Sequence, residues 1–351
     1  MSRLAKLFEV NRRGVNFTRG LWVTGILLAP LAVLGPLGLE KYWLSLSFAA
    51  LSLALMDPGG TYEHRLRAMA GVGLAGAPVV ALGFAIGGGP WGVVVVVAFA
   101  VTLLAGLAMR FGRHGLTAAL LINSWFLVAI AVPEPEHLTA SQAGWWQQTL
   151  AWLIGAALWI ALTLVVWLAR GRIPQDSHFP EVPDDMSVTP LSRPVVLFAV
   201  VRALAVAIAV AIAFGLQLPN ADWMPIAVMV AMKPSLGQAA FASEQRIAGA
   251  FIGALIATLF LLTVHNKYVL DVVIGILGAF AATFRAANYA LYSAGVAAAV
   301  LIAEDVSHPT NLGAEGRRVL FTFVGLGIGI GVLFLAGVIQ KRSAQAGSPT
   351  T

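Results

Sequence analysis

The sequence predicts an all-α, polytopic membrane protein of about 12 transmembrane helices, arranged as two parallel repeats of about six helices each. Three observations support this fold class. Hydrophobic residues make up 59% of the chain and charged residues only 11%, whereas soluble domains carry roughly 25% charged residues. Apolar runs near the ~20 residues that span a bilayer recur along the chain. A short polar elbow occurs twice, which indicates two similar halves.

The first half is predicted over residues 1–169. Basic residues precede its first apolar run, which is too long for the hydrophobic region of a signal peptide and has no good cleavage site at its end. We therefore expect a retained first helix. The apolar runs of this half lie at residues 21–39, 42–56, 68–87, 91–109, 115–132 and 145–169.

A polar, proline-rich segment at residues 170–193 separates the halves. Such a segment cannot cross lipid, where every backbone group needs an internal partner, so we predict an aqueous linker. The second half is predicted over residues 194–340, followed by a polar tail at 341–351. Its apolar runs lie at residues 194–216, 222–232, 246–264, 268–284, 287–303 and 315–339. The run at 222–232 is short and could extend into the elbow that follows it.

Each half carries one elbow between an apolar run and a glycine-bearing apolar segment. The second elbow begins at Met232 and is the more strongly marked copy; the first begins at Met56. Residues at corresponding positions are Asp57 and Lys233, Pro58 and Pro234, Arg67 and Arg246, and Arg110 and Arg285. An even number of helices in each half would give both halves the same orientation in the membrane.

The distribution of basic residues predicts the topology. If the N-terminus is cytoplasmic, most Lys and Arg residues fall on the inner side, as the positive-inside rule requires. Both termini and the linker are then cytoplasmic. This assignment places the acidic stretch from Pro133 to His137 outside, which is acceptable because acidic residues carry little topological weight.

The second elbow and the helix after it resemble those of the fusaric acid resistance-like family, the aromatic acid exporters of bacterial inner membranes. The resemblance rests on Lys233-Pro234-Ser235, on the spacing from there to Arg246, and on Gly249 and Gly253, with echoes in the first half. It implies an efflux protein of the inner membrane, and some relatives work with a periplasmic adaptor. Many members also carry a large soluble domain, in whose place only the linker stands here.

Plant anion channels of the malate type look like distant relatives that have one such half per chain and use two chains. That similarity implies two halves facing one another across a central pathway. A small organic anion, with aromatic carboxylic acids as the expected class, would be the substrate. The bilayer is the other partner.

The candidate substrate-binding residues are mainly cations, since the planar fork of arginine matches a carboxylate in two places. Lys233, Arg246, Arg67, Arg110 and Arg285 could form a basic ring at the cytoplasmic mouth. Alternatively, they are topological anchors whose charged groups reach water.

The elbow residues Asp57, Pro58, Pro234 and Ser235 interrupt the chain, so the helices after them begin with free amide groups that would attract an anion. An ordinary helix–loop–helix turn explains the same pattern.

Three kinds of residue inside the apolar runs complete the candidate set. Arg202 either lines the path or pairs with a carboxylate such as Glu244, and we favour pairing because an unpaired charge in lipid is costly. Asn123, Tyr289 and Tyr292 could line a path for an aromatic acid. Hydrogen bonds between helices are the alternative role for these three.

Composition and motifs argue against several other classes. The net charge is +6, but the basic residues are scattered between apolar runs, which is not typical of nucleic-acid binding. No phosphate-binding loop and no histidine pair with metal-ligand spacing occurs, so we expect no enzyme activity, no metal and no cofactor. Three functions remain: an exporter driven by the proton gradient, a passive anion channel, and a membrane assembly or envelope protein that transports nothing.

Overall fold

The computed structural model describes residues 7–131, 144–174, 190–218, 223–232, 236–264, 266–305 and 320–335, together with residues 188 and 317. The regular elements of this part of the chain are helices, which confirms the all-α prediction. Eight of the helices are long and apolar enough to cross a membrane. The chain is therefore a multi-pass membrane protein.

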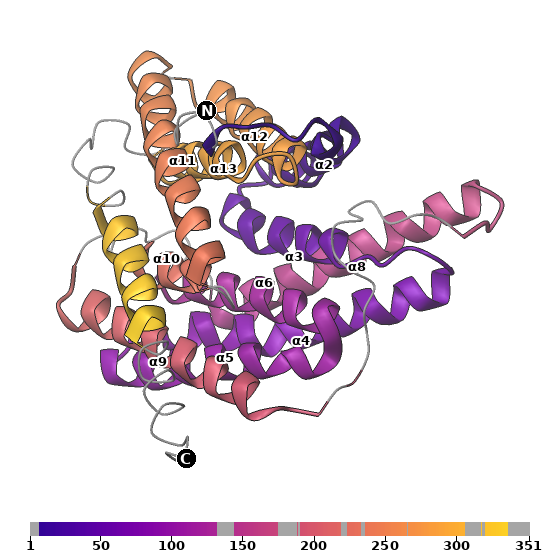
Figure 1. Cartoon of the computed structure of the whole chain (residues 1–351). Helices are drawn as coiled ribbons and strands as arrows, with labels where there is room; N and C mark the ends of the chain where they lie inside the picture. Colours follow the sequence, from indigo (N-terminus) through magenta and orange to yellow (C-terminus); the bar gives the residue numbers. More distant parts are fainter. Residues whose placement is uncertain are drawn as a thin grey trace, which may run out of the picture.

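Each predicted apolar run overlaps one helix, and Figure 1 shows how these helices are arranged. The helices are α2 (Phe17–Leu34), α3 (Trp43–Leu55), α4 (Tyr62–Ile86), α5 (Trp91–Leu107), α6 (Gly112–Ala131), α8 (Trp145–Ala169), α9 (Arg193–Gly215), α10 (Trp223–Ala231), α11 (Leu236–Thr263), α12 (Lys267–Phe284) and α13 (Tyr289–Asp305), followed by Leu320–Leu335. Three 3-10 helices are η1 (Arg12–Gly14), η2 (Glu40–Tyr42) and η3 (Ala108–Phe111).

Two helices are by themselves shorter than the thickness of the hydrocarbon core. Helix α3 has 13 residues and α10 has 9, so they extend about 20 Å and about 14 Å, less than the hydrocarbon core of about 30 Å. Helix α13 and the helix Leu320–Leu335 are also shorter than the long spans. The all-α membrane class and eight spanning helices are thus confirmed, whereas the prediction of about 12 spanning helices in two repeats is not.

Helices from the two predicted halves pack together. Helix α2 lies along α12, and α9 lies along α5, as Figure 1 shows. Within the first half, α8 packs on both α3 and α4. Within the second half, α11 packs on α13. The first helix of each predicted half therefore contacts the fourth helix of the other half.

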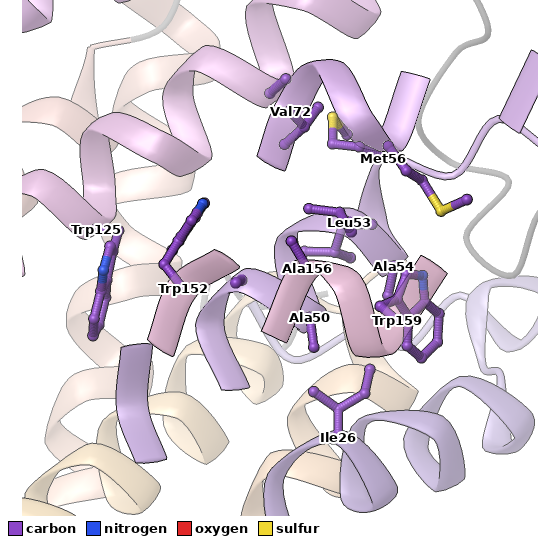
Figure 2. Close-up of a cluster of buried hydrophobic side chains, with 14 of the residues drawn as sticks. Ile26, Ala50, Leu53, Ala54, Met56, Val72, Trp125, Trp152, Ala156 and Trp159 are labelled. Atoms are coloured by element: carbon purple, nitrogen blue, oxygen red, sulfur yellow. The ribbon is translucent and has the colours of Figure 1, made fainter. Parts of the chain in front are cut away.

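The packing of α3, α4 and α8 combines tryptophans with small residues (Figure 2). The side chain of Trp152 is fully buried, and its Nε1 donates to the carbonyl of Gly73 over 2.9 Å. A Cβ added to Gly76 would lie 2.3 Å from the Trp152 ring, so only glycine permits this approach. Trp159 lies in the same cluster near Ala54 (Figure 2). This interface holds α3 and α4, the two helices that flank the first elbow, against α8.

The outward faces of the long helices are apolar. Leu74 on α4, Val96 on α5, Val165 on α8 and Leu259 on α11 are all exposed. Such extensive exposed apolar surface suits hydrocarbon and not water. These faces are the lipid-contacting surface of the protein.

Candidate functional site

The N-terminal segment, residues 7–16, folds over the turn between α12 and α13 (Figure 1). The amide Nδ2 of Asn288 donates to the carbonyls of Leu7 over 2.9 Å and Glu9 over 3.0 Å. The Nε2 of Gln245 on α11 donates to the same Leu7 carbonyl over 3.1 Å. Two buried amide side chains thus hold the segment in place.

A cavity of about 650 Å³ lies between this segment, α11 and the α12–α13 turn. Its lining includes two guanidinium groups, two aromatic rings and an amide, contributed by Arg12, Arg285, Phe241, Tyr289 and Asn288. Glu9 also borders it. The cavity therefore joins cationic groups to ring surfaces. We call it the basic cavity.

Two further arginines lie near residues that line the basic cavity, although they are not part of its lining. Arg246 on α11 lies against the hydroxyl of Tyr289, and the ring of Tyr289 lies 5.7 Å from that of Tyr292. Arg19 is buried behind the turn, where its Nη1 donates to the carbonyl of Ala282 over 3.4 Å. Arg285 is close enough to Arg19 for their two positive charges to repel each other. Because like charges repel, an anion among these guanidinium groups would be stabilised.

The structure brings some predicted site residues together and leaves others apart. Arg246, Arg285, Tyr289 and Tyr292 meet beside the basic cavity. Arg67 instead pairs on the surface with Glu63 over 2.8 Å, with both side chains more than 70% exposed (73% and 78%). Arg110, in η3, is exposed too. Neither Arg12 nor Gln245 was predicted from the sequence to be a site residue. A basic N-terminal segment and a glutamine within a helix occur in many sequences, so they do not mark a site.

The first elbow contains a buried ion pair that the sequence analysis did not identify. Arg65 on α4 donates from Nε to Asp57 Oδ1 over 2.8 Å and from Nη2 to Oδ2 over 2.6 Å. Both side chains are fully buried. The backbone N–H of Gly59 also donates to Asp57 Oδ1, over 3.1 Å. Pro58 is half-buried beside this pair. Asp57 therefore fixes the shape of the elbow.

A second polar cluster lies in the core between α5, α6, α9 and α10. Arg202 donates from Nη2 to the main-chain carbonyl of Met229 over 2.8 Å, and not to the carboxylate that we favoured. The Nδ2 of Asn123 lies 3.3 Å from Thr102 Oγ1 and 3.2 Å from the Met229 sulfur. Asn123 thus takes the expected alternative role of a hydrogen bond between helices.

The remaining predicted elbow residues, Lys233, Pro234 and Ser235, lie outside the described residues. Within the described part of the chain, no group of three or more His, Asp and Glu side chains is placed to hold a metal ion.

The apolar helices define a multi-pass membrane protein, and its basic cavity lies where the N-terminal segment meets α11 and the α12–α13 turn. Residues 204–332 match a family described as fusaric acid resistance protein-like. The matched stretch runs from α9 into the helix Leu320–Leu335 and confirms the resemblance found in the sequence. Comparisons with curated proteins and with solved structures gave no match.

Proposed function

We propose that the protein exports small organic anions across the bacterial inner membrane and that aromatic carboxylic acids are its substrates. The observation that carries this proposal is the basic cavity, in which Arg12 and Arg285 lie beside Phe241 and Tyr289. A carboxylate would pair with the guanidinium groups, and an aromatic ring would pack on the two aromatic side chains.

The size and the position of the basic cavity fit this role. Its volume of about 650 Å³ falls in the usual range of small-molecule sites, roughly 300–1,000 Å³. The cavity lies beside the N-terminal segment, which the positive-inside rule assigns to the cytoplasm. A substrate would then enter from the cell interior. A periplasmic adaptor on the opposite side would be a further partner.

The helix pairing supports a molecule of two six-helix halves. The pairs α2–α12 and α9–α5 correspond, because each joins a first helix to a fourth helix of the other half. The domain bounds are those given by the sequence, residues 1–169 and 194–340, with a cytoplasmic linker and tail. In this arrangement the second half supplies most of the basic cavity.

A passive anion channel is the second candidate function. Proton coupling needs a carboxylate that can take up and release a proton, and Asp57 is held by Arg65 in a buried ion pair. A channel needs no such group. The basic cavity would serve a channel equally well, since rings of cations draw anions into a pore.

Flux measurements in proteoliposomes separate these functions. The probe is radiolabelled benzoate, measured with and without an imposed pH gradient. Neutral benzoic acid crosses bilayers unaided, so flux is compared with that into protein-free liposomes. Accumulation above that level that depends on the gradient supports the exporter, and equal excess flux without the gradient supports the channel. Absence of excess flux for every anion tested would refute both and leave an assembly or envelope role.

Substitutions then test the basic cavity. Arg285→Ala and Arg246→Ala should each reduce benzoate flux at least about tenfold, because a hydrogen bond to a charged group is worth about 1.5–3 kcal/mol. Arg110→Ala is the matched control, since Arg110 is exposed in η3, and it should leave flux unchanged. Wild-type flux in both cavity variants would exclude this cavity as the entry site.

A further inference from the structure

Two buried arginines stand beside the short helices α3 and α10. Arg65 contacts Asp57, two residues after the end of α3, and Arg202 contacts Met229 in the last turn of α10. Arg65 is fully buried and Arg202 is 6% exposed. Both arginines therefore contact the C-terminal end of a helix that is by itself shorter than the hydrocarbon core.

Their partners differ in charge. The carboxylate of Asp57 binds Arg65 through both oxygens and neutralises it. Among the described residues, Arg202 donates to the neutral carbonyl of Met229, and its Nε has no hydrogen-bond partner there. In the sequence, the position that corresponds to Asp57 is occupied by Lys233. Within the described part of the second half, no carboxylate pairs with Arg202.

The apolar surroundings of Arg202 disfavour its positive charge. Arg202 belongs to α9, whose neighbouring residues Ala205, Val206 and Ala209 are part of a buried apolar cluster. A lone guanidinium in such a site is disfavoured, whereas a carboxylate beside it compensates the charge and uses the free N–H groups. The end of α10 attracts the cation through its free carbonyls, but that interaction involves only a partial charge.

A second buried hydrogen-bond donor, Asn123, also contacts Met229. Asn123 is fully buried, and its Nδ2 contacts only the Thr102 hydroxyl at 3.3 Å and the Met229 sulfur at 3.2 Å. A thioether is a weak acceptor. Met229 therefore touches both groups, with its carbonyl on Arg202 and its sulfur on Asn123. Methionine side chains are flexible and can withdraw from such a contact.

We propose that Arg202 and Asn123 form a second anion site within the membrane, which binds the carboxylate of the transported acid after it leaves the basic cavity. The ligand carboxylate displaces the Met229 thioether, accepts from Arg202 Nε and Asn123 Nδ2, and takes the role that Asp57 plays toward Arg65 in the first half. This inference rests on the proposed function for the identity of the ligand. Met229 occupies the site when no anion is present.

Benzoate binding to the purified protein in lipid nanodiscs tests the site separately from transport. Arg285→Ala removes the basic cavity's contribution, so the binding that persists in this variant should belong to the second site. Adding Arg202→Met, which keeps the length of the side chain and removes the charge, should weaken that residual binding at least about tenfold. Arg202→Lys keeps the charge and should retain part of it. Residual binding that is unaffected by Arg202→Met would overturn the proposal.

Met229→Ala supplies a second test, in which the expected result is tighter binding, an effect that a misfolded protein would not produce. Removal of the thioether leaves the carbonyl on Arg202 and empties the place of the ligand, so benzoate should bind several-fold more tightly. Unchanged or weaker binding by the folded variant would show that Met229 does not occupy an anion site.

Flux distinguishes failure of this inference from failure of the proposed function. In proteoliposomes, Arg202→Met should lower benzoate flux while the binding that depends on Arg285 persists. If the folded Arg202→Met variant transports as the wild type does, the second site is wrong and the transport function stands. If the wild type binds benzoate through Arg202 but never transports it, the transport function is wrong and the site stands.

Discussion

The ion pair between Arg65 and Asp57 shows how one pair of residues determines an elbow. Its carboxylate also accepts the N–H of Gly59, so one side chain holds both the start of α4 and the turn before it. A fully buried pair of this kind is costly to form, but the loss of one partner is costlier, because the other charge is left without compensation.

Asp57→Asn should therefore destabilise the protein by about 3–5 kcal/mol. Thermal unfolding in detergent, followed by circular dichroism, measures the loss as a lower midpoint. Glu63→Gln is the control, because the Arg67–Glu63 pair is exposed and should contribute about 0–1 kcal/mol. An Asp57→Asn protein as stable as Glu63→Gln would mean that the buried pair does not hold the elbow.

The sequence could not reveal which arginine of α4 is buried. Arg65 and Arg67 are two residues apart, so they point to nearly opposite sides of a helix. Alignment of the elbows favoured Arg67 as the partner of Arg246, yet Arg65 faces the protein and Arg67 faces outward. That choice depends on how α4 rotates against α3 and α8. Hydropathy alone carries no information about this rotation.

At the scale of helices, hydropathy located each element but misplaced two beginnings. Helix α4 begins at Tyr62 and α11 at Leu236, whereas the apolar runs begin at residues 68 and 246. Both helices continue through polar residues, and the Arg67–Glu63 contact is an i,i+4 pair that supports the first turns of α4. An apolar run marks the part of a helix that suits lipid, and the hydrogen-bonded helix can extend beyond it.

The contact between α11 and α13 depends on two glycines. A Cβ at Gly249 would lie 2.5 Å from the carbonyl oxygen of Ala290, and one at Gly253 would lie 2.7 Å from that of Ala294. Small residues at this spacing let membrane helices approach closely. The sequence shows the spacing of these glycines but not the partner helix.

Gly249→Val should lower stability by about 1–3 kcal/mol, because the added atoms force the two backbones apart. The midpoint of thermal unfolding measures the effect. Gly71→Ala on α4 is the control: no atom lies within 4 Å of its added Cβ, and alanine favours a helix over glycine by up to about 1 kcal/mol. Equal stability of the two variants would rule out a close α11–α13 contact.

At the scale of the whole molecule, the absence of cysteine from the sequence allows a direct test of topology. A cysteine introduced at Leu37, between α2 and α3, should react with a membrane-impermeant maleimide in intact cells. One introduced at Arg172, after α8, should react only once the membrane is opened. Both side chains are exposed. The reverse labelling pattern would place the N-terminus outside and contradict entry through the basic cavity from the cytoplasm.

The sequence indicated two halves but not how they join. Helices such as α5 and α9 are apolar over most of their surface, so their sequences give no preferred face and no partner. The pairing of α2 with α12 and of α9 with α5 is a long-range property. For the same reason, the sequence predicted Arg285 as a residue of the basic cavity but neither Arg12 nor the N-terminal segment that carries it.

The packing of α2 on α12 also constrains the order of assembly during synthesis. A ribosome that adds roughly 5–20 residues per second needs on the order of ten to fifty seconds to proceed from α2 to α12. Throughout this interval α2 is in the membrane without its main partner, and buried Arg19 has not yet reached the carbonyl of Ala282. The first helix to be inserted is therefore among the last to be fully packed. The cavity closed by the N-terminal segment can form only after the C-terminal part of the chain has emerged.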